Sequence, residues 1–252
     1  MVDSPLRDKL YIVTGASAGI GRACARQLAA RGAELLLLAR RQERLDEVVS
    51  ECGPRARGLV VDVTASDVLA KLTAAGGLEA FGLINNAGLA LGREKVAEAQ
   101  ISDWDAMWRT NVDAVFKLTH TLVPAMLARG GGDILNVCSI AGHWTYPGGS
   151  VYCATKHAVW AFTKVLREET CGKNLRVMQI SPGMVESEFS QVRFKGDDAA
   201  ARAVYHGMQP LSADDVARQM VFMLEQPRHV CIDEIVTMPT DQGAPTTVAR
   251  HR

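Results

Sequence analysis

Short apolar runs alternate with longer amphipathic segments along almost the whole chain, and this alternation limits the possible folds most strongly. Seven of the runs have the length of a strand, namely residues 10–14, 34–38, 58–61, 82–85, 133–139, 175–181 and 234–238. Several of them lack alternating polar positions, which is typical of strands buried on both faces of a parallel sheet. The pattern therefore predicts a parallel sheet of about seven strands.

The segments between these runs show helical periodicity, and they are residues 19–31, 41–52, 66–75, 102–129, 150–171 and 213–226. A strand–helix–strand order with short connections implies right-handed crossovers, with helices on both faces of the sheet. We expect an α/β fold of the Rossmann type, a doubly wound parallel sheet forming one catalytic domain over residues 1–252. In such sheets, ligands bind beyond the carboxyl ends of the strands.

Composition and charge narrow the classes of partner. The 252 residues are 48% hydrophobic, enough for one sizeable core. Lys+Arg and Asp+Glu balance at 28 each, so overall charge favours neither nucleic acid nor a membrane surface. Residues 1–10 contain no apolar stretch like a signal-peptide core, and every apolar run is too short to span a bilayer. We expect a soluble, cytoplasmic protein.

Cysteine usage agrees with that compartment. The six cysteines form no C-x-x-C pair, so neither a structural zinc site nor another bound metal is expected. Most lie in apolar surroundings, where a free cysteine behaves as a small hydrophobic residue. A reducing cytoplasm fits such a chain better than an oxidising compartment.

A glycine-rich turn, Thr14-Gly-Ala-Ser-Ala-Gly-Ile-Gly21, follows the first strand and opens the first helix. Gly15 permits the turn, Gly19 permits close approach of a pyrophosphate to the backbone, and Gly21 permits close packing of the helix. The N–H groups around Ser17, Ala18 and Ile20 lie at the positive end of that helix. This context predicts a dinucleotide-binding site.

The T-G-x-x-x-G-x-G spacing resembles that of the short-chain dehydrogenase/reductase family, and later motifs extend the resemblance over nearly the whole chain. It implies a catalytic set of four residues, namely Asn111, Ser139, Tyr152 and Lys156. It also implies further cofactor contacts at Asp62, Val63, Asn86, Ala87, Gly88, Pro182, Gly183 and Val185, besides Tyr152 and Lys156.

The end of the second strand indicates which cofactor is bound. An NAD enzyme usually carries Asp or Glu there to bind the ribose hydroxyls, whereas this chain has Arg40 and Arg41. A guanidinium group binds a phosphate through a planar fork of donors. We expect NADP, although both arginines would also suit a solvated helix start.

Tyr152 and Lys156 are four residues apart on a predicted helix and therefore share one face. The ammonium group of Lys156 is expected to lower the pKa of the Tyr152 phenol, which ordinarily lies near about 10. Tyr152 would then serve as general acid or base. Ser139 would donate a hydrogen bond to the substrate oxygen, and the resemblance gives Asn111 a water-linked proton relay to Lys156.

The substrate is indicated by residues 182–194, by Leu91-Gly92 and by residues 227–230, which resemble the NADP-dependent 3-hydroxy acid dehydrogenase subgroup. That subgroup oxidises serine, allo-threonine and related acids, and relatives reduce sulfoacetaldehyde and malonic semialdehyde. Arg193 is the candidate cation for the acid group, and His143 and Tyr146 are candidate pocket residues. Residues 187–205 form either a substrate lid or a solvated loop–helix insertion. His143-Trp144 makes this pocket wall bulkier than a small hydroxy acid requires.

Two other functions remain open. One is a carbonyl reductase, for sulfoacetaldehyde or a larger aldehyde or ketone. The other is a non-catalytic NADP-sensing regulator, against which the complete catalytic set argues. The resemblance also implies a homodimer or homotetramer through the helices at 102–129 and 150–171. The polar tail at 240–252 is expected either to be disordered or to dock on a neighbouring subunit.

Overall fold

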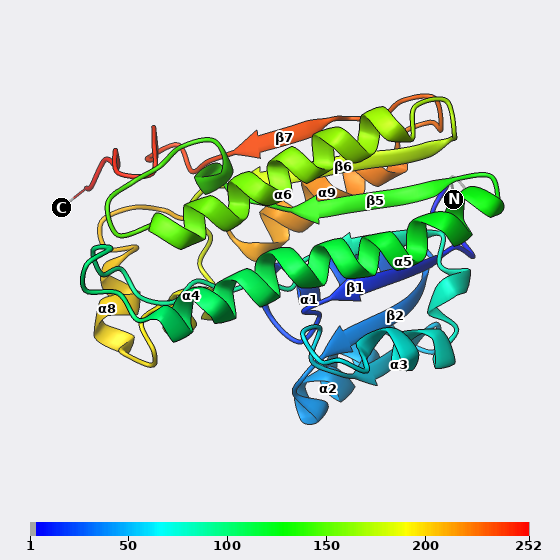
Figure 1. Ribbon diagram of the computed structural model, residues 1–252, viewed down its shortest axis with the longest axis horizontal. Helices are drawn as coiled ribbons and strands as arrows, with labels where there is room; N and C mark the ends of the chain where they lie inside the picture. Colours follow the sequence, from blue (N-terminus) through cyan, green and yellow to red (C-terminus); the bar gives the residue numbers. More distant parts are fainter. Residues whose placement is uncertain (1–3, 252) are drawn as a thin grey trace.

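The computed structural model describes residues 4–251, and they form one seven-stranded sheet (Figure 1). The strand order is β3-β2-β1-β4-β5-β6-β7, and every pair is parallel. The strands are β1 (Leu10–Thr14), β2 (Glu34–Ala39), β3 (Ala56–Val60), β4 (Gly82–Asn85), β5 (Gly132–Val137), β6 (Leu175–Pro182) and β7 (Glu234–Thr237). The predicted Rossmann-type α/β sheet is confirmed, with strand ends shifted by at most two residues.

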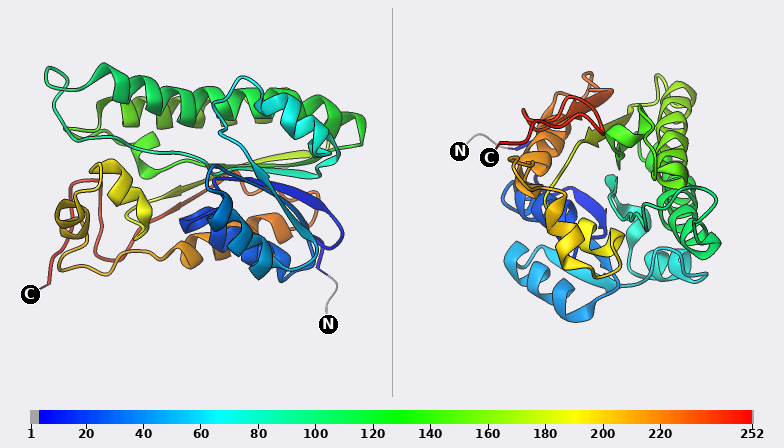
Figure 2. Two further views of the ribbon diagram at one scale, coloured as in Figure 1. Left: turned by 90° about the horizontal axis from the view of Figure 1, so that it is seen from below. Right: turned by 90° about the vertical axis from the view of Figure 1, so that its left-hand side faces the viewer.

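Helices cover both faces of the sheet, as Figure 2 shows from below. One face carries α1 (Gly19–Ala29), α2 (Gln42–Cys52) and α9 (Ala213–Glu225). The other carries α3 (Val68–Ala74), α5 (Ala114–Ala128) and α6 (Ser150–Glu169). Shorter elements complete the chain, namely α4 (Ile101–Trp108), α7 (Glu188–Arg193), α8 (Asp198–Ala203) and the short turns η1 (Gly77–Glu79), η2 (Arg109–Asp113) and η3 (Ile140–Gly142).

The four successive leucines of β2 show why the strands read as continuous apolar runs. Leu35 and Leu37 belong to the core under α1, α2 and α9. Leu36 and Leu38 belong to the core under α3, α5 and α6. Side chains alternate between faces along a strand, and both faces of this strand are covered. Full burial of one leucine contributes about 1.5–3 kcal/mol, so the alternate leucines of β2 stabilise both cores.

The helix expected over residues 102–129 is interrupted. It begins as α4, widens into the π-helical turn η2 and continues as α5. A single π turn adds one residue to an otherwise α-helical run, and the helical patterns on either side of it still fit α periodicity, so the sequence did not reveal the widening. The turn contains Asn111, and single π turns inside α-helices often occur at functional sites.

The last segments fold back onto the same chain. Gln242 and Val248 form an antiparallel bridge, and the N–H of His251 donates to the Gly207 carbonyl. Arg250 donates to the carbonyls of Val204 and His206, just after α8. The tail through residue 251 therefore packs against its own chain rather than standing free of it, and docking on a neighbouring subunit stays a prediction. Residue 252, and residues 1–3 of the predicted domain, lie outside the described part.

Candidate active site

A cleft of about 350 Å³ opens beyond the carboxyl ends of the strands, as expected for this topology. Its lining includes most of the predicted cofactor residues, namely Gly15, Ser17, Ala18, Gly19, Ile20, Arg40, Arg41, Asp62, Val63, Asn86, Ala87, Gly88, Pro182, Gly183 and Val185. Ser139, Tyr152 and Lys156 line the same cleft. The topology therefore brings the glycine turn and three of the four predicted catalytic residues together.

The glycine turn is shaped by its contact with β4. A Cβ atom at Gly21 would lie 2.4 Å from the Gly15 carbonyl oxygen and 2.5 Å from Asn86 Nδ2. Asn86 Nδ2 donates to the Thr14 carbonyl at 2.8 Å, and the backbone N–H of Asn86 donates to Thr14 Oγ1 at 2.9 Å. Gly21 is thus needed for Asn86 to hold the turn, while Gly15 adopts a φ of 65°.

The start of α1 is suited to a phosphate group. Its N-cap residue Ala18 makes no side-chain capping bond, and the first turn of the helix carries no acidic residue. The first N–H groups of a helix need an acceptor, and the helix dipole favours a negative one. The described residues around this turn therefore fit a dinucleotide pyrophosphate.

The two arginines after β2 differ in their surroundings. The Arg40 side chain is 68% exposed and lies 3.7 Å from an Asp62 carboxylate oxygen. Arg41 donates to Glu188 at 2.8 Å, at the start of α7, and to Ser17 Oγ at 3.4 Å in the glycine turn. Both arginines therefore line the cleft at the carboxyl end of β2, and each lies beside an acidic residue of opposite charge, Asp62 for Arg40 and Glu188 for Arg41.

Tyr152 and Lys156 are both buried on α6. Lys156 Nζ lies 5.9 Å from the centre of the Tyr152 ring and donates to the Val137 carbonyl at 3.0 Å. The Ser139 hydroxyl oxygen accepts from the N–H of Ala141 at 3.1 Å, and its O–H points to the Pro182 carbonyl at 3.5 Å. This hydrogen bond to the Pro182 carbonyl is long, so a substrate oxygen can replace the carbonyl as its acceptor at small cost.

The protonation state of Tyr152 differs from the sequence expectation. Burial raises the pKa of Tyr152 to about 12, although a hydrogen bond with Ser139 and the Arg193 charge act against the rise. Burial likewise lowers the pKa of Lys156. The phenol is therefore protonated in the chain without cofactor, because desolvation outweighs the nearby positive charges.

Asn111 does not line the cleft but braces its wall. Its Nδ2 donates to the Leu89 carbonyl at 2.8 Å and to Thr155 Oγ1 at 3.1 Å, and its Oδ1 accepts from the N–H of Leu89 at 2.9 Å. A Cβ at Gly88 would lie 3.2 Å from Asn111 Oδ1 and 3.7 Å from Lys156 Nζ. The π turn η2 thus places Asn111 behind Gly88 and close to Lys156.

Arg193, at the end of α7, lies next to the reaction centre. Its guanidinium carbon is 5.3 Å from the centre of the Tyr152 ring and 5.7 Å from that of Tyr146. Arg193 Nη2 donates to the Tyr146 hydroxyl at 2.8 Å. Two of the three residues predicted only for the substrate therefore meet beside Tyr152.

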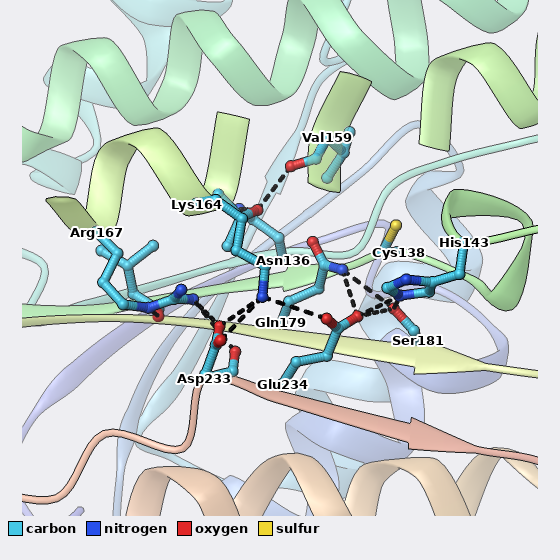
Figure 3. Close-up of polar contacts among 12 residues, drawn as sticks. Asn136, Cys138, His143, Val159, Lys164, Arg167, Gln179, Ser181, Asp233 and Glu234 are labelled. Atoms are coloured by element: carbon cyan, nitrogen blue, oxygen red, sulfur yellow. Dashed lines mark hydrogen bonds and ion pairs between the residues drawn. The ribbon is translucent and has the colours of Figure 1, made fainter. Parts of the chain in front are cut away.

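His143 is directed elsewhere. Its Nε2 lies 2.6 Å from a Glu234 carboxylate oxygen and 3.3 Å from Ser181 Oγ, on the β6–β7 side of the turn (Figure 3). Like Arg193 and Tyr146, it is absent from the described residues that line the cleft. Unlike the Arg193 guanidinium, its ring makes no ring contact or hydrogen bond with Tyr152 in the described part of the chain. The predicted pocket role of His143 therefore has no support in its position, because its ring serves this polar cluster.

Several residues that contribute to the site were not predicted from the sequence. Phe189 packs against Tyr152 with ring centres 5.8 Å apart, and Glu188 bonds Arg41 across the cleft. Thr14 Oγ1 and the Val137 carbonyl hold Asn86 and Lys156. Phe189 and Glu188 lay in a segment already singled out, but their partners are far away in the sequence and left no local signal.

Within residues 4–251, no group of three or more His, Cys, Asp or Glu side chains is arranged to hold a metal ion. Over the same range, no helix combines the length and apolar character needed to cross a membrane.

A glycine turn on an uncapped helix, with a buried Tyr–Lys pair at the same strand ends, defines a dinucleotide-binding oxidoreductase. The family model described as short chain dehydrogenase matches residues 9–198. The chain belongs to the short-chain dehydrogenase family, which confirms the resemblance and the prediction of an oxidoreductase.

Similar proteins match nearly the whole chain. It is 39% identical to an NADP-dependent 3-hydroxy acid dehydrogenase of Schizosaccharomyces pombe, over 99% of this chain and 99% of that protein. It is 42% identical to a sulfoacetaldehyde reductase of Chromohalobacter salexigens, over 92% of this chain and 94% of the relative. Among solved structures, the closed form of a serine dehydrogenase complexed with NADP⁺ superposes with a TM-score of 0.91, at 37% identity, covering 96% of this chain and 99% of that one.

Proposed function

We propose that this protein is an NADP(H)-dependent oxidoreductase that interconverts a short 3-hydroxy acid and the corresponding carbonyl compound. The position of Arg193 carries the proposal. Its guanidinium group lies 5.3 Å from the Tyr152 ring and is held there by the Tyr146 hydroxyl. A planar guanidinium binds a carboxylate through two parallel hydrogen bonds. A substrate oxygen at Tyr152 and an acid group at Arg193 suit a small hydroxy acid.

Tyr152 moves the proton in this reaction. NADP(H), when bound, supplies or accepts the hydride. In reduction, the protonated phenol donates its proton to the substrate oxygen, and its pKa of about 12 keeps that proton available at neutral pH. In oxidation, Tyr152 must accept the hydroxyl proton, which requires positive charge nearby. Lys156 Nζ and the Arg193 guanidinium carbon, 5.9 and 5.3 Å from the centre of the Tyr152 ring, belong to the groups that provide that charge.

Ser139 and Asn111 support this transfer. The Ser139 oxygen is held by the N–H of Ala141, so its O–H is oriented to stabilise negative charge developing on the substrate oxygen. Asn111 lies on the far side of Gly88, from which a water-linked relay would reach Lys156. Lys156 would also bind the cofactor ribose, as in the family.

Arg40 and Arg41 would hold the 2′-phosphate that distinguishes NADP from NAD. Both line the cleft at the carboxyl end of β2. NADP dependence in the Schizosaccharomyces pombe relative, and NADP⁺ in the serine dehydrogenase structure, support this cofactor.

Residues 187–205, with α7 and α8, would act as a lid on the single domain. Glu188, Phe189 and Val192 of α7 already line the cleft, and Arg41 bonds to Glu188 across it. The tail packs against residues 204–207 and so restrains the far end of this segment.

A second candidate is a carbonyl reductase acting on sulfoacetaldehyde or on a larger aldehyde or ketone. The 42% identity to a sulfoacetaldehyde reductase favours it. A sulfonate, like a carboxylate, is a singly charged group whose oxygens accept hydrogen bonds from a guanidinium, so Arg193 suits both.

A panel of substrates tests these alternatives through the absorbance change of the cofactor. It contains serine, allo-threonine and other 3-hydroxy acids, sulfoacetaldehyde, and neutral aldehydes and ketones. We expect turnover of a 3-hydroxy acid, and we expect Arg193→Met to raise KM for anionic substrates by about 10-fold or more. Arg193→Lys, which keeps the charge but loses the fork, serves as the control.

Other outcomes of the panel point elsewhere. Turnover of neutral carbonyls alone, unaffected by Arg193→Met, would favour a reductase of larger substrates. Tight NADP binding without turnover of any compound would favour a sensor.

We also propose a cytoplasmic homodimer or homotetramer. The six cysteines are free thiols, which suits a reducing compartment. The exposed Trp108 and Val165 lie on the helical layer built from α4, α5 and α6. Light scattering coupled to size-exclusion chromatography measures the assembly, and a monomer at micromolar concentration would contradict it.

A further inference from the structure

A largely buried polar cluster of His143, Gln179, Ser181 and Glu234 takes no part in the chemistry described above (Figure 3). Its centre is Glu234 on β7, whose side chain is only 12% exposed. One carboxylate oxygen of Glu234 accepts from Gln179 Nε2 at 2.7 Å and from Ser181 Oγ at 2.6 Å, and lies 2.6 Å from His143 Nε2. Although burial opposes it, these hydrogen bonds lower the pKa of Glu234. The Glu234 carboxylate is therefore ionised and accepts these hydrogen bonds as an anion.

The residues bound to Glu234 lie on both sides of Ser139. Ser139 caps the start of η3, and His143 follows the end of the same turn. Ser181 immediately precedes Pro182, whose carbonyl faces the Ser139 hydroxyl at 3.5 Å. A single carboxylate thus holds the turn that carries Ser139 and the strand end against which that hydroxyl rests.

The start of β7 also restrains α6, mainly through Asp233, the residue before that strand. Lys164 on α6 donates to both Asp233 oxygens, at 2.8 and 2.9 Å, and lies 3.4 Å from Glu234. Arg167 pairs with Asp233 at 2.5 Å. Asp233 therefore anchors the helix of Tyr152, whereas Glu234 alone of these two acidic residues reaches His143 and Ser181. This makes Asp233 a matched control.

Ser181, His143 and Glu234 are the residue types of a hydrolytic triad, but their geometry excludes that role. The same imidazole nitrogen faces both Ser181 and Glu234, so the ring cannot relay a proton between them. Ser181 has an exposure of 0%, which leaves no room for an acyl substrate.

We propose that Glu234 is a positioning residue that keeps the Ser139 hydroxyl aligned with the substrate oxygen through His143 and Ser181. Hydrogen bonds to an ionised acceptor are about twice as strong as neutral ones. A charge-stabilising donor is effective only when neighbouring groups hold it in place. The proposal rests on the proposed function for the role of Ser139, while the position of Ser139 can be tested without any turnover.

Two substitutions test it by kinetics. Glu234→Leu removes the acceptor, and His143→Phe removes the donor while keeping an aromatic ring in contact with Trp144 and Trp160. Each should lower kcat on the order of 10-fold, because misplacing a catalytic group by a fraction of an ångström reduces the stabilisation of the transition state more than the binding of the substrate. KM for NADP(H) should change by less than about 2-fold, since neither residue lines the cofactor cleft.

Conservative and control variants separate positioning from general damage. Glu234→Gln retains an acceptor oxygen and should keep most of the activity. Asp233→Asn should leave kcat unchanged although it weakens the contact with α6. Equal losses in Glu234→Gln and Glu234→Leu, or an equal loss in Asp233→Asn, would overturn the proposal.

A double-mutant cycle identifies the residue through which Glu234 acts. In a Ser139→Ala background, His143→Phe should cause no further loss of kcat, because the hydroxyl it positions is gone. A further loss of the full single-variant size would show a different route and overturn the proposal.

A crystal structure of the His143→Phe variant supplies a readout that needs no substrate. We expect Ser139 Oγ to leave its present position between the Ala141 N–H and the Pro182 carbonyl. An unchanged Ser139 would overturn the positioning role. A wild-type protein without turnover would contradict the proposed function instead, and this structural comparison would still decide the role of Glu234.

Discussion

The two ends of the parallel strands, the amino edge and the carboxyl edge of the sheet, use buried polar groups in opposite ways. At the amino edge, the fully buried Asp133 accepts from Tyr11 at 2.9 Å and from two Arg176 nitrogens at 2.8 and 2.9 Å, and lies 2.5 Å from Arg228. At the carboxyl edge, Lys156 has three N–H donors and directs one of them at the Val137 carbonyl. One edge is saturated with partners, and the other retains bonding capacity for a ligand.

This difference separates stability from chemistry. A buried carboxylate with complementary donors on several sides ties strands and termini together, and removing one member leaves a charge uncompensated. Groups with spare donors contribute less to folding but are available to a reacting molecule. We therefore expect substitutions at the amino edge to change the free energy of unfolding, and substitutions at the carboxyl edge to change kinetic constants.

The largest effect is expected at Tyr152. Tyr152→Phe should reduce kcat by roughly 10²–10⁴-fold, because it deletes the proton donor and keeps the buried ring. Steady-state kinetics with the substrate identified by the panel measures it, and fluorescence titration should show NADP(H) binding retained. Substantial remaining turnover would remove Tyr152 from its assigned role.

The opposite edge gives the next effect. Asp133→Asn should lower the free energy of unfolding by about 3–5 kcal/mol, because it leaves Arg176 and Arg228 without their shared anion. Urea denaturation measures the loss, and kcat of the folded fraction should remain near the wild-type value. A large fall in kcat at unchanged stability would break the division between the edges.

Arg40 gives a smaller effect at the carboxyl edge. Arg40→Ala should weaken NADP binding by about 10-fold and leave NAD binding unchanged, since only NADP carries the 2′-phosphate. Comparing the two dissociation constants measures it, with Arg44→Ala, an exposed arginine of α2 outside the described cleft lining, as control. Equal affinities for the two cofactors in the wild-type protein would refute the assignment.

The smallest effect concerns pH. Burial and the Asp133 charge raise the pKa of Tyr11 well above its ordinary value. Above about pH 10 the unfolded chain loses this proton while the folded chain keeps it, so stability falls as pH rises. Tyr11→Phe should lower the free energy of unfolding by about 1 kcal/mol at neutral pH. In this variant, that free energy should also fall less steeply as the pH rises above neutral. Denaturation curves at several alkaline pH values check this, and an unchanged decline would contradict it.

Features encoded within a few residues of each other were predictable. The Gly15–Gly21 turn and the Tyr152–Lys156 spacing describe local geometry, which follows from the strand and helix that bear them. The alternation of apolar runs predicted the sheet, because burial on both faces removes polar positions from a strand.

Features that depend on distant partners were not predictable. Glu234 meets His143 across 91 residues, and no local pattern marks that pairing. The pKa of Tyr152 was expected to fall because its neighbours in sequence and motif are cationic. Its burial, which depends on Phe189 and the packing of α6, raises the pKa instead.

The wide turn η2 has a consequence for how this chain tolerates change in length. Met107 before it packs with Tyr152 and Ala141, whereas Leu118 and Leu122 after it pack on the sheet. Removing one residue from 109–113 would restore an unbroken α-helix and rotate α4 by about 100° relative to α5. The number of residues in η2 thus sets the rotation of α4 relative to α5. Substitutions within η2 can preserve that rotation, but a single-residue deletion would turn Met107 away from Tyr152.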